Sequence, residues 1–209
     1  MTTKYEEALV LKTEPSGESF LKLYLLSAES GIFLCLKRLS RSKRAQTSTT
    51  PDLFDQASIS LEMSQQRTMR FVQEYLLLQR REAIGQNYHS LSCAARLSQL
   101  LVSNASHMPE SERLFQLTAR SLDAFAAGKA PEVVLLKALY LLLKDEGYPV
   151  RESWWPTLRI DLRGQARQLL RSPAPSQLDK AAKTDCERIE QHLTDWMRHH
   201  TELIVPHES

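Results

Sequence analysis

The spacing of apolar residues changes near residue 81, and this change constrains the fold more than any other feature of the chain. Before residue 81, apolar residues recur at every second position, which is typical of β-strands with one buried face. After it they recur at every third or fourth position, as in amphipathic helices. The 209 residues suffice for two small domains. We therefore expect an α+β chain, with a β domain over residues 1–80 and an all-helical domain over residues 81–209.

The first part of the chain predicts five short strands. They cover Glu7–Thr13, Ser19–Ser27, Gly31–Arg38, Ala57–Met63 and Met69–Gln79. Tight turns containing proline or glycine separate the first three, and a long polar loop follows the third. This count indicates a small closed barrel, and a five-stranded OB-fold fits it. An SH3-like barrel fits the pattern almost as well.

The second part of the chain predicts a helix bundle. The stretch Val133–Leu143 is apolar almost all round, so we expect it at the buried centre of the bundle. Gly147 is the expected left-handed cap at the end of this helix. Residues 151–162 read as irregular, and a short helix over Arg163–Leu170 follows. A last helix is expected roughly over Leu178–Leu203.

One stretch, LKRLSRSKRAQTSTTPD (residues 36–52), concentrates positive charge. Five of the eight residues from Lys37 to Arg44 are Lys or Arg and none is acidic, whereas the net charge of the whole chain is only +2. Such cations bind phosphates without reading base sequence. The stretch connects two strands of one small domain, so it is not an interdomain linker. Its composition leaves a solvated loop and a nucleic-acid contact equally open.

The neighbouring strands supply further side chains that suit nucleic acid. Aromatic rings stack on bases, and cations contact the backbone. The additional cations are Lys12, Lys22, Arg67, Arg70, Arg80 and Arg81, and the rings are Phe20, Tyr24, Phe33, Phe71 and Tyr75. On pattern alone, most of these rings belong to the core.

We find no arrangement of residues that is typical of an enzyme. The glycines are isolated, so no phosphate-binding glycine motif is present. His192 and His199 would lie about 10 Å apart by helical rise, too far for one zinc ion. Cys35, Cys93 and Cys186 form no metal-binding pair, and we interpret them as buried or free thiols in a reducing cytoplasm. We expect no catalysis, no cofactor and no metal.

No targeting or membrane segment is expected. The N-terminal MTTKYEEALVL lacks the apolar core of a signal peptide. The longest apolar stretch is much shorter than the roughly 20 residues that span a bilayer.

Several stretches follow one another in an order that resembles the RecO family of DNA repair proteins. They are ALVLKTEPSGESFLKLYLLSAESG, the basic run from Lys37 to Arg44, PDLFDQASISL, LLKALYLLLKDEGYPV and RIEQHLTDWMRHHTEL. The resemblance covers nearly the whole chain. The sequence departs from the family pattern in two places. Arg38 replaces a glycine, and the stretch GYPVRESWWPTLRIDLRG has no cysteine where many members carry a four-cysteine zinc module. We therefore expect no zinc here, with Trp154, Trp155 and Pro156 packing in place of the module.

This resemblance implies a non-catalytic mediator of DNA repair and recombination. Such proteins bind single- and double-stranded DNA, anneal complementary strands and, with RecR, load RecA onto strands coated by single-strand-binding protein (SSB). They work in the bacterial cytoplasm at the nucleoid. The DNA contacts that we expect here are Lys37, Arg38, Arg41, Lys43, Arg44 and Arg70.

The family also binds the acidic, Phe-ending tail of SSB in an apolar pocket with basic residues. In this chain Arg120, Lys137 and Arg151 are the candidates for that contact.

Two other functions stay open at this point. The first is a non-catalytic protein-interaction module that makes no direct DNA contact, in which the basic loop is only a connector. The second is a hydrolase whose site is assembled from distant residues, such as His89 or His107. The salt dependence of DNA binding separates the first from a DNA-binding protein.

Overall fold

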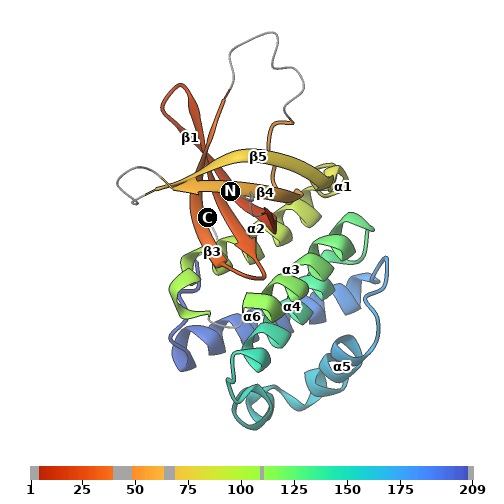
Figure 1. The fold of residues 1–209 in the computed structure, drawn as a ribbon. Helices are drawn as coiled ribbons and strands as arrows, with labels where there is room; N and C mark the ends of the chain where they lie inside the picture. The colour runs from red at the N-terminus through yellow and green to blue at the C-terminus, as the bar shows by residue number, and fades with distance from the viewer. Residues whose placement is uncertain (1–4, 40–48, 64–68, 109–110, 207–209) are drawn as a thin grey trace. The chain divides into compact units, whose positions relative to one another are not determined.

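The computed structural model describes residues 5–39, 49–63, 69–108 and 111–206 (Figure 1). The chain divides into two compact units. One comprises Met1–Arg81 with Met108–Phe115, and the other Glu82–His107 with Gln116–Ser209. The first unit holds a closed five-stranded barrel and the second is helical, which confirms the predicted α+β class.

All five predicted strands are present. Their bounds are β1 Tyr5–Ser16, β2 Phe20–Ser27, β3 Gly31–Arg38, β4 Gln56–Met63 and β5 Arg70–Gln79. The main difference from the prediction is the length of β1, which extends at both ends. Its first residues pair with β4 and its later residues with β2, with Ala8 and Leu9 paired to both. A bulge between Val10 and Lys12 bends the strand between these two pairings.

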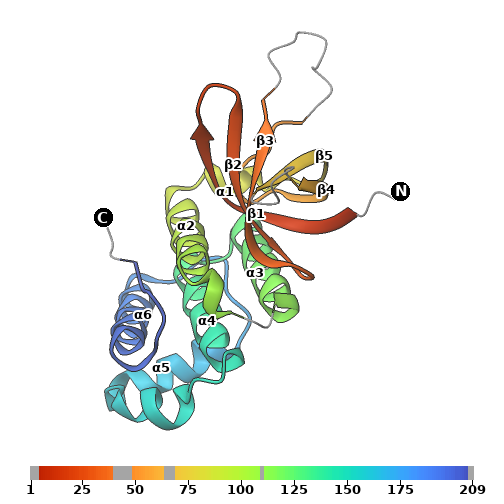
Figure 2. The same ribbon diagram turned by 60° about the vertical axis from the view of Figure 1, so that its left-hand side comes forward.

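The strands close in the order β1-β2-β3-β5-β4, with β4 returning to β1; Figure 2 labels all five. The pairs β1–β2, β2–β3, β4–β5 and β1–β4 are antiparallel. The pair β3–β5 is parallel, with Cys35 opposite Arg70 and Lys37 opposite Val72. Since residues opposite each other in a sheet share one face, this register fixes which side chains line the interior and which lie outside.

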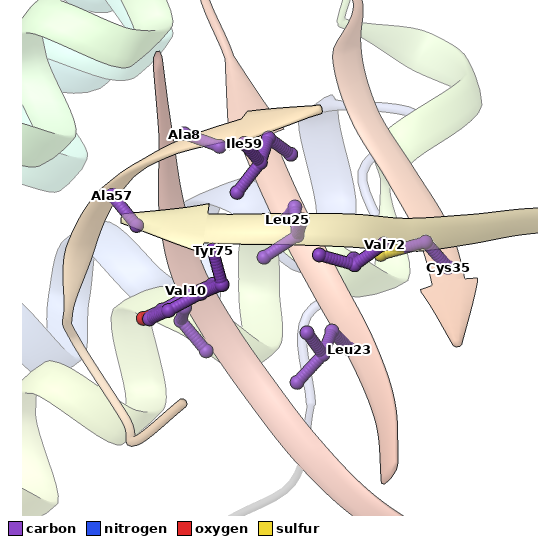
Figure 3. Close-up of a cluster of buried hydrophobic side chains, with 9 residues drawn as sticks. All are labelled: Ala8, Val10, Leu23, Leu25, Cys35, Ala57, Ile59, Val72 and Tyr75. Atoms are coloured by element: carbon purple, nitrogen blue, oxygen red, sulfur yellow. The ribbon is translucent and has the colours of Figure 1, made fainter. Parts of the chain in front are cut away.

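The barrel interior is filled by small and branched apolar side chains. Figure 3 shows Ala8, Val10, Leu23, Leu25, Cys35, Ala57, Ile59, Val72 and Tyr75 converging between the strands. Leu21, Phe33, Leu61 and Leu77 pack against this cluster and are partly buried. The period-two pattern of the sequence identifies the inner rows of β2 and β4 correctly. For β3 it is wrong: the apolar alternation puts Ile32, Leu34 and Leu36 on the buried row, whereas Cys35 lies inside with Phe33 against the core, because Cys35 and Phe33 pair with the inner Leu23 and Leu25 of β2. Met63 lies on the same alternating row of β4 as Ala57, Ile59 and Leu61, yet it is 48% exposed at the end of that strand.

A short segment from a later part of the chain belongs to the barrel unit. Residues Met108–Phe115, which include the first turn of helix α3 (Ser111–Ala126), group with the strands. The Ser111 hydroxyl donates a hydrogen bond of 2.8 Å to the carbonyl of Ala28 in the β2–β3 turn. The Ser111 Cβ also lies 3.7 Å from where a Cβ on Gly31 would stand.

Helix α4 (Pro131–Asp145) is the centre of the helical unit. It packs against α2 (Tyr88–Ser103), α5 (Ile160–Arg171) and α6 (Lys180–His200), as Figure 2 shows. Its buried residues are Val133, Val134, Leu135, Leu136, Ala138, Leu139, Leu142 and Leu143, so the predicted central position is confirmed. A short helix, α1 (Glu82–Gly85), precedes α2.

The end of α4 has the geometry that the sequence indicates. Gly147 has φ +82°, a left-handed conformation, and Tyr148 donates its N–H to the carbonyl of Leu143 over 2.9 Å. A single π-helical turn, Val150–Trp154, and a 3-10 turn, Trp155–Thr157, follow where the sequence reads as irregular. Trp154 is fully buried at this point and supports both turns.

Cys35, Cys93 and Cys186 are all buried thiols without disulfides, as predicted. Burial raises the pKa of each to about 12, so none is a reactive thiolate at neutral pH. Across the described ranges, no three His, Cys, Asp or Glu side chains gather as a metal site. None of the helices in those ranges is both long and apolar enough to cross a membrane.

Candidate nucleic-acid interface

Three of the six predicted DNA contacts can be located in the structure. Lys37 and Arg38 are the last two residues of β3, and Arg70 is the first residue of β5. Arg41, Lys43 and Arg44 lie outside the described residues, as does Arg67.

Lys37 and Arg38 lie on opposite faces of β3. Lys37 follows Phe33 and Cys35 on the inner row and is paired with Leu21 of β2, which packs on the core. Burial lowers its pKa, because partial desolvation disfavours the charged ammonium. Arg38 is exposed on the outer row, opposite Phe20 of β2. The two cations therefore serve different surfaces, although the sequence presents them as one run.

Arg70 joins Lys37 on the inner side of the barrel. It is paired with Cys35, and its guanidinium lies 4.8 Å from the centre of the Phe33 ring, a cation–π contact. We call Phe33, Lys37 and Arg70 the barrel mouth, because β3 ends and β5 begins there. Within the described part of the chain, neither cation of the mouth forms an ion pair.

The outer side of β1, β2, β3 and β5 combines aromatic rings with cations. We call this surface the outer face; its residues are Lys12, Glu14, Phe20, Lys22, Tyr24, Leu36, Arg38 and Phe71. The Phe20 and Phe71 rings come from different strands and lie 6.0 Å apart between centroids. Both rings are half-buried, so part of each stays accessible. Leu36 lies between them in the register.

One carboxylate, Glu14, lies among the cations of the outer face. Its oxygens are 2.6 Å from the Lys12 ammonium and 3.7 Å from that of Lys22, and it accepts a 3.3 Å hydrogen bond from Tyr24. The hydrogen bond from Lys12 holds the pKa of Glu14 below its ordinary value. Arg38 has no carboxylate partner among the described residues. Among these residues three cations lie with one carboxylate, and Glu62 of β4, opposite Phe71, adds a carboxylate at the edge of the face.

Two cations that the sequence suggested for DNA instead stabilise the barrel. Asp55 is completely buried and binds Arg80 through two hydrogen bonds, of 3.0 and 2.9 Å. Tyr75 donates its hydroxyl to the same carboxylate over 2.9 Å, and burial raises the pKa of this phenol. Arg81, 3% exposed, donates to the carbonyl of Phe54 over 2.9 Å. Phe54 has φ +66°, so this bond fixes a strained turn before β4.

The aromatic candidates divide in the same way. Phe20, Tyr24 and Phe71 lie on the outer face, whereas Phe33 and Tyr75 pack in or against the core. Of the additional cations, Lys12 and Lys22 lie on the outer face. The sequence alone does not make this division, because Asp55, Arg80 and Tyr75 meet only after the barrel has closed.

The three candidates for the SSB tail have different environments. Arg120 is exposed on α3. Lys137 on α4 donates to the carbonyls of Leu170, over 3.3 Å, and Ser172, so it caps the end of α5; burial lowers its pKa. Arg151 is exposed and lines a pocket between α4, the turns after it and α5. Arg151 lines this pocket, whereas Arg120 and Lys137 do not.

The same pocket contains cations that the sequence did not single out. They are Lys144, Arg167 and Arg171. These residues are up to 27 positions apart and follow no motif, so a sequence pattern gives no signal for them.

Comparisons with models of known protein families and with curated protein sequences give no match. The RecO resemblance therefore stays a prediction that rests on the residues quoted above.

Proposed function

We propose that this chain is a non-catalytic mediator of DNA repair and recombination of the RecO type, whose barrel is an OB-fold that binds single-stranded DNA. The observation that carries the proposal is the outer face, where Phe20 and Phe71 lie beside Lys22 and Arg38.

The strand arrangement supports the OB-fold. OB-folds are five-stranded barrels that bind oligonucleotides on the face of strands two and three, between the loops that follow strands one and four. In this chain the aromatic rings and cations of the outer face are centred on β2 and β3. Phe20 directly follows the β1–β2 turn, and Arg70 directly follows the loop between β4 and β5.

The chemistry of the outer face suits a strand of any sequence. Every base has a π-face, and stacking on a protein ring is worth about 1–3 kcal/mol per base. Lys22 and Arg38 supply phosphate contacts that carry no sequence information. A base stacked on Phe20 or Phe71 keeps its Watson–Crick edge exposed, so the bound strand can pair with its complement. This arrangement provides for strand annealing without any catalytic group.

Double-stranded DNA is bound in the proposal through phosphates alone. The partners RecR, RecA and SSB follow from the family resemblance.

The proposal is tested by the affinity of the full chain for a fluorescein-labelled oligo-dT strand, measured by anisotropy at fixed salt. Phe20→Leu with Phe71→Leu keeps apolar volume but removes both stacking rings, and should weaken binding at least about tenfold. Arg38→Glu should weaken it as well, because it replaces a phosphate contact by a repulsive charge. Lys180→Glu is the matched control, since this exposed residue starts α6 in the helical unit.

Wild-type affinity in both outer-face variants would contradict the proposal. It would favour the protein-interaction module, for which no DNA contact on this face is needed.

A further inference from the structure

The helical unit contains a second cationic and aromatic surface, separate in the chain from the barrel. It is a pocket whose wall includes Tyr140 and Lys144 of α4, Arg151 and Trp155 of the turns, and Arg167 and Arg171 of α5. We call it the helical pocket. Every charged side chain that lines it is basic.

The four cations of the helical pocket are not neutralised within the described residues. Lys144, Arg151, Arg167 and Arg171 are exposed, and none forms an ion pair there. Other cations of this unit do form pairs: Arg159 with Asp161, Lys183 with Glu132, Arg188 with Asp185 and Arg198 with Asp195. The pocket is therefore a local concentration of positive charge, which attracts a polyanion.

The two aromatic rings of the pocket are supported from behind by Trp154. This buried ring lies 6.0 Å from Tyr140 and 6.0 Å from Trp155, between ring centroids. Its indole N–H donates to Nδ1 of His192 over 3.0 Å, which anchors it to α6. Tyr140 and Trp155 are half-buried, so each keeps an accessible part.

We infer that the helical pocket is a second binding site for single-stranded DNA, with phosphates on its four cations and a base stacked on Trp155. A nucleotide strand matches this combination, because it offers an anion at every residue and a π-face beside it. An acidic peptide ending in an aromatic residue would need a closed apolar slot for its last side chain. The pocket offers only Leu141 and Leu170 as aliphatic wall.

A second DNA site extends the proposed function. It rests on that function only in its role in annealing, which requires two complementary strands to be held at once. One chain with a site in each unit could hold both, whereas a chain with the outer face alone would need a second copy.

The positions of the tryptophans allow a direct test. All three, Trp154, Trp155 and Trp196, belong to the helical unit, and the barrel unit has none. Tryptophan emission of the full chain should be quenched by unlabelled oligo-dT. Most of the quenching should disappear in Trp155→Phe, and all of it in the double variant Arg167→Glu with Arg171→Glu.

Two further variants separate this inference from the proposed function. Phe20→Leu with Phe71→Leu should lose one of the two bound strands in the anisotropy titration but keep the quenching. Lys180→Glu with Arg188→Glu makes the same change of charge on α6, outside the pocket, and should keep it too. At saturation, the wild type should bind two short strands per chain and the Arg167/Arg171 variant one.

Unchanged quenching in the Arg167/Arg171 variant would overturn the inference. So would quenching by an acidic, Phe-ending peptide but not by oligo-dT, because that result would make the pocket a protein-partner site. Either outcome leaves the barrel proposal intact, since the outer-face variants test it separately.

Discussion

Replacing Asp55 by alanine should destabilise the barrel strongly without removing any residue of the outer face. The Asp55 carboxylate is 0% exposed and accepts hydrogen bonds from Arg80, from the Tyr75 hydroxyl and from the N–H of Asp52. Its removal leaves a guanidinium and a phenol without their acceptor in a buried site.

The size of the effect follows from the environment of Arg80. Breaking a buried ion pair by removing one partner costs about 3–5 kcal/mol. Arg80 keeps 29% of its side chain exposed and a 2.9 Å hydrogen bond to the carbonyl of Thr50, so water and this bond compensate in part. We therefore expect the lower end of the range, about 3 kcal/mol of unfolding free energy.

Amide hydrogen exchange measures this loss in the barrel itself, without depending on the helical unit. A loss of about 3 kcal/mol should speed the exchange of the slowest amides in β4 and β5 by more than about a hundredfold. Asp52→Ala is the matched control. The Asp52 carboxylate accepts only an exposed 2.8 Å bond from Leu53 among the described residues, and its loss should cost less than about 1 kcal/mol. Equal exchange in Asp55→Ala and wild type would refute the structural role of this network.

Three further predictions concern charged groups. Glu14→Gln should tighten oligo-dT binding several-fold, because it frees Lys12 and Lys22 and removes the carboxylate that lies between them. Glu29→Gln, in the β2–β3 turn, is the control in the same anisotropy assay. Burial lowers the pKa of Lys37 below its ordinary value of 10.5, and a bound phosphate should raise it again. The affinity for oligo-dT should therefore fall as the pH rises through the lowered pKa of the free protein. Lys37→Arg should abolish that fall, because arginine stays charged. Arg96→Ala should cost the helical unit about 2–3 kcal/mol in urea unfolding, because it leaves the nearly buried Glu190 without its 2.9 Å partner; unchanged unfolding would show that Thr194 suffices.

The barrel was predictable because its signals are local. Alternating apolar residues and turn residues determine β2, β3 and β4 to within one residue. The alternation separates Lys37 from Arg38, but it assigns the wrong row of β3 to the interior, since Ile32, Leu34 and Leu36 look more apolar than the row of Cys35 and Lys37. The sequence still presents the basic run as one unit, since charge is counted along the chain and not by face.

The candidate sites were predictable only in part, because they depend on how the folded chain brings distant residues together. Arg80 looks like a DNA-binding cation until Asp55, 25 positions earlier, is brought against it. The helical pocket forms where Lys144 of α4 lies near Arg167 and Arg171 of α5. Neither helix carries a sequence motif that predicts this arrangement. Polar contacts between distant residues leave no periodic pattern in the sequence, whereas burial of one face of a strand or helix does.

The central claim, that the outer face binds single-stranded DNA through phosphates and stacking, is tested most directly by the salt dependence of oligo-dT affinity. The three cations of the outer face, Lys12, Lys22 and Arg38, give a slope of log affinity against log salt of roughly −2.1 on a single strand when each contacts one phosphate, since each contact accounts for about −0.7. We predict a slope of this size for the wild type and a slope flatter by about 0.7 for Arg38→Glu. A wild-type slope near zero, or an Arg38→Glu slope equal to that of the wild type, would contradict the account.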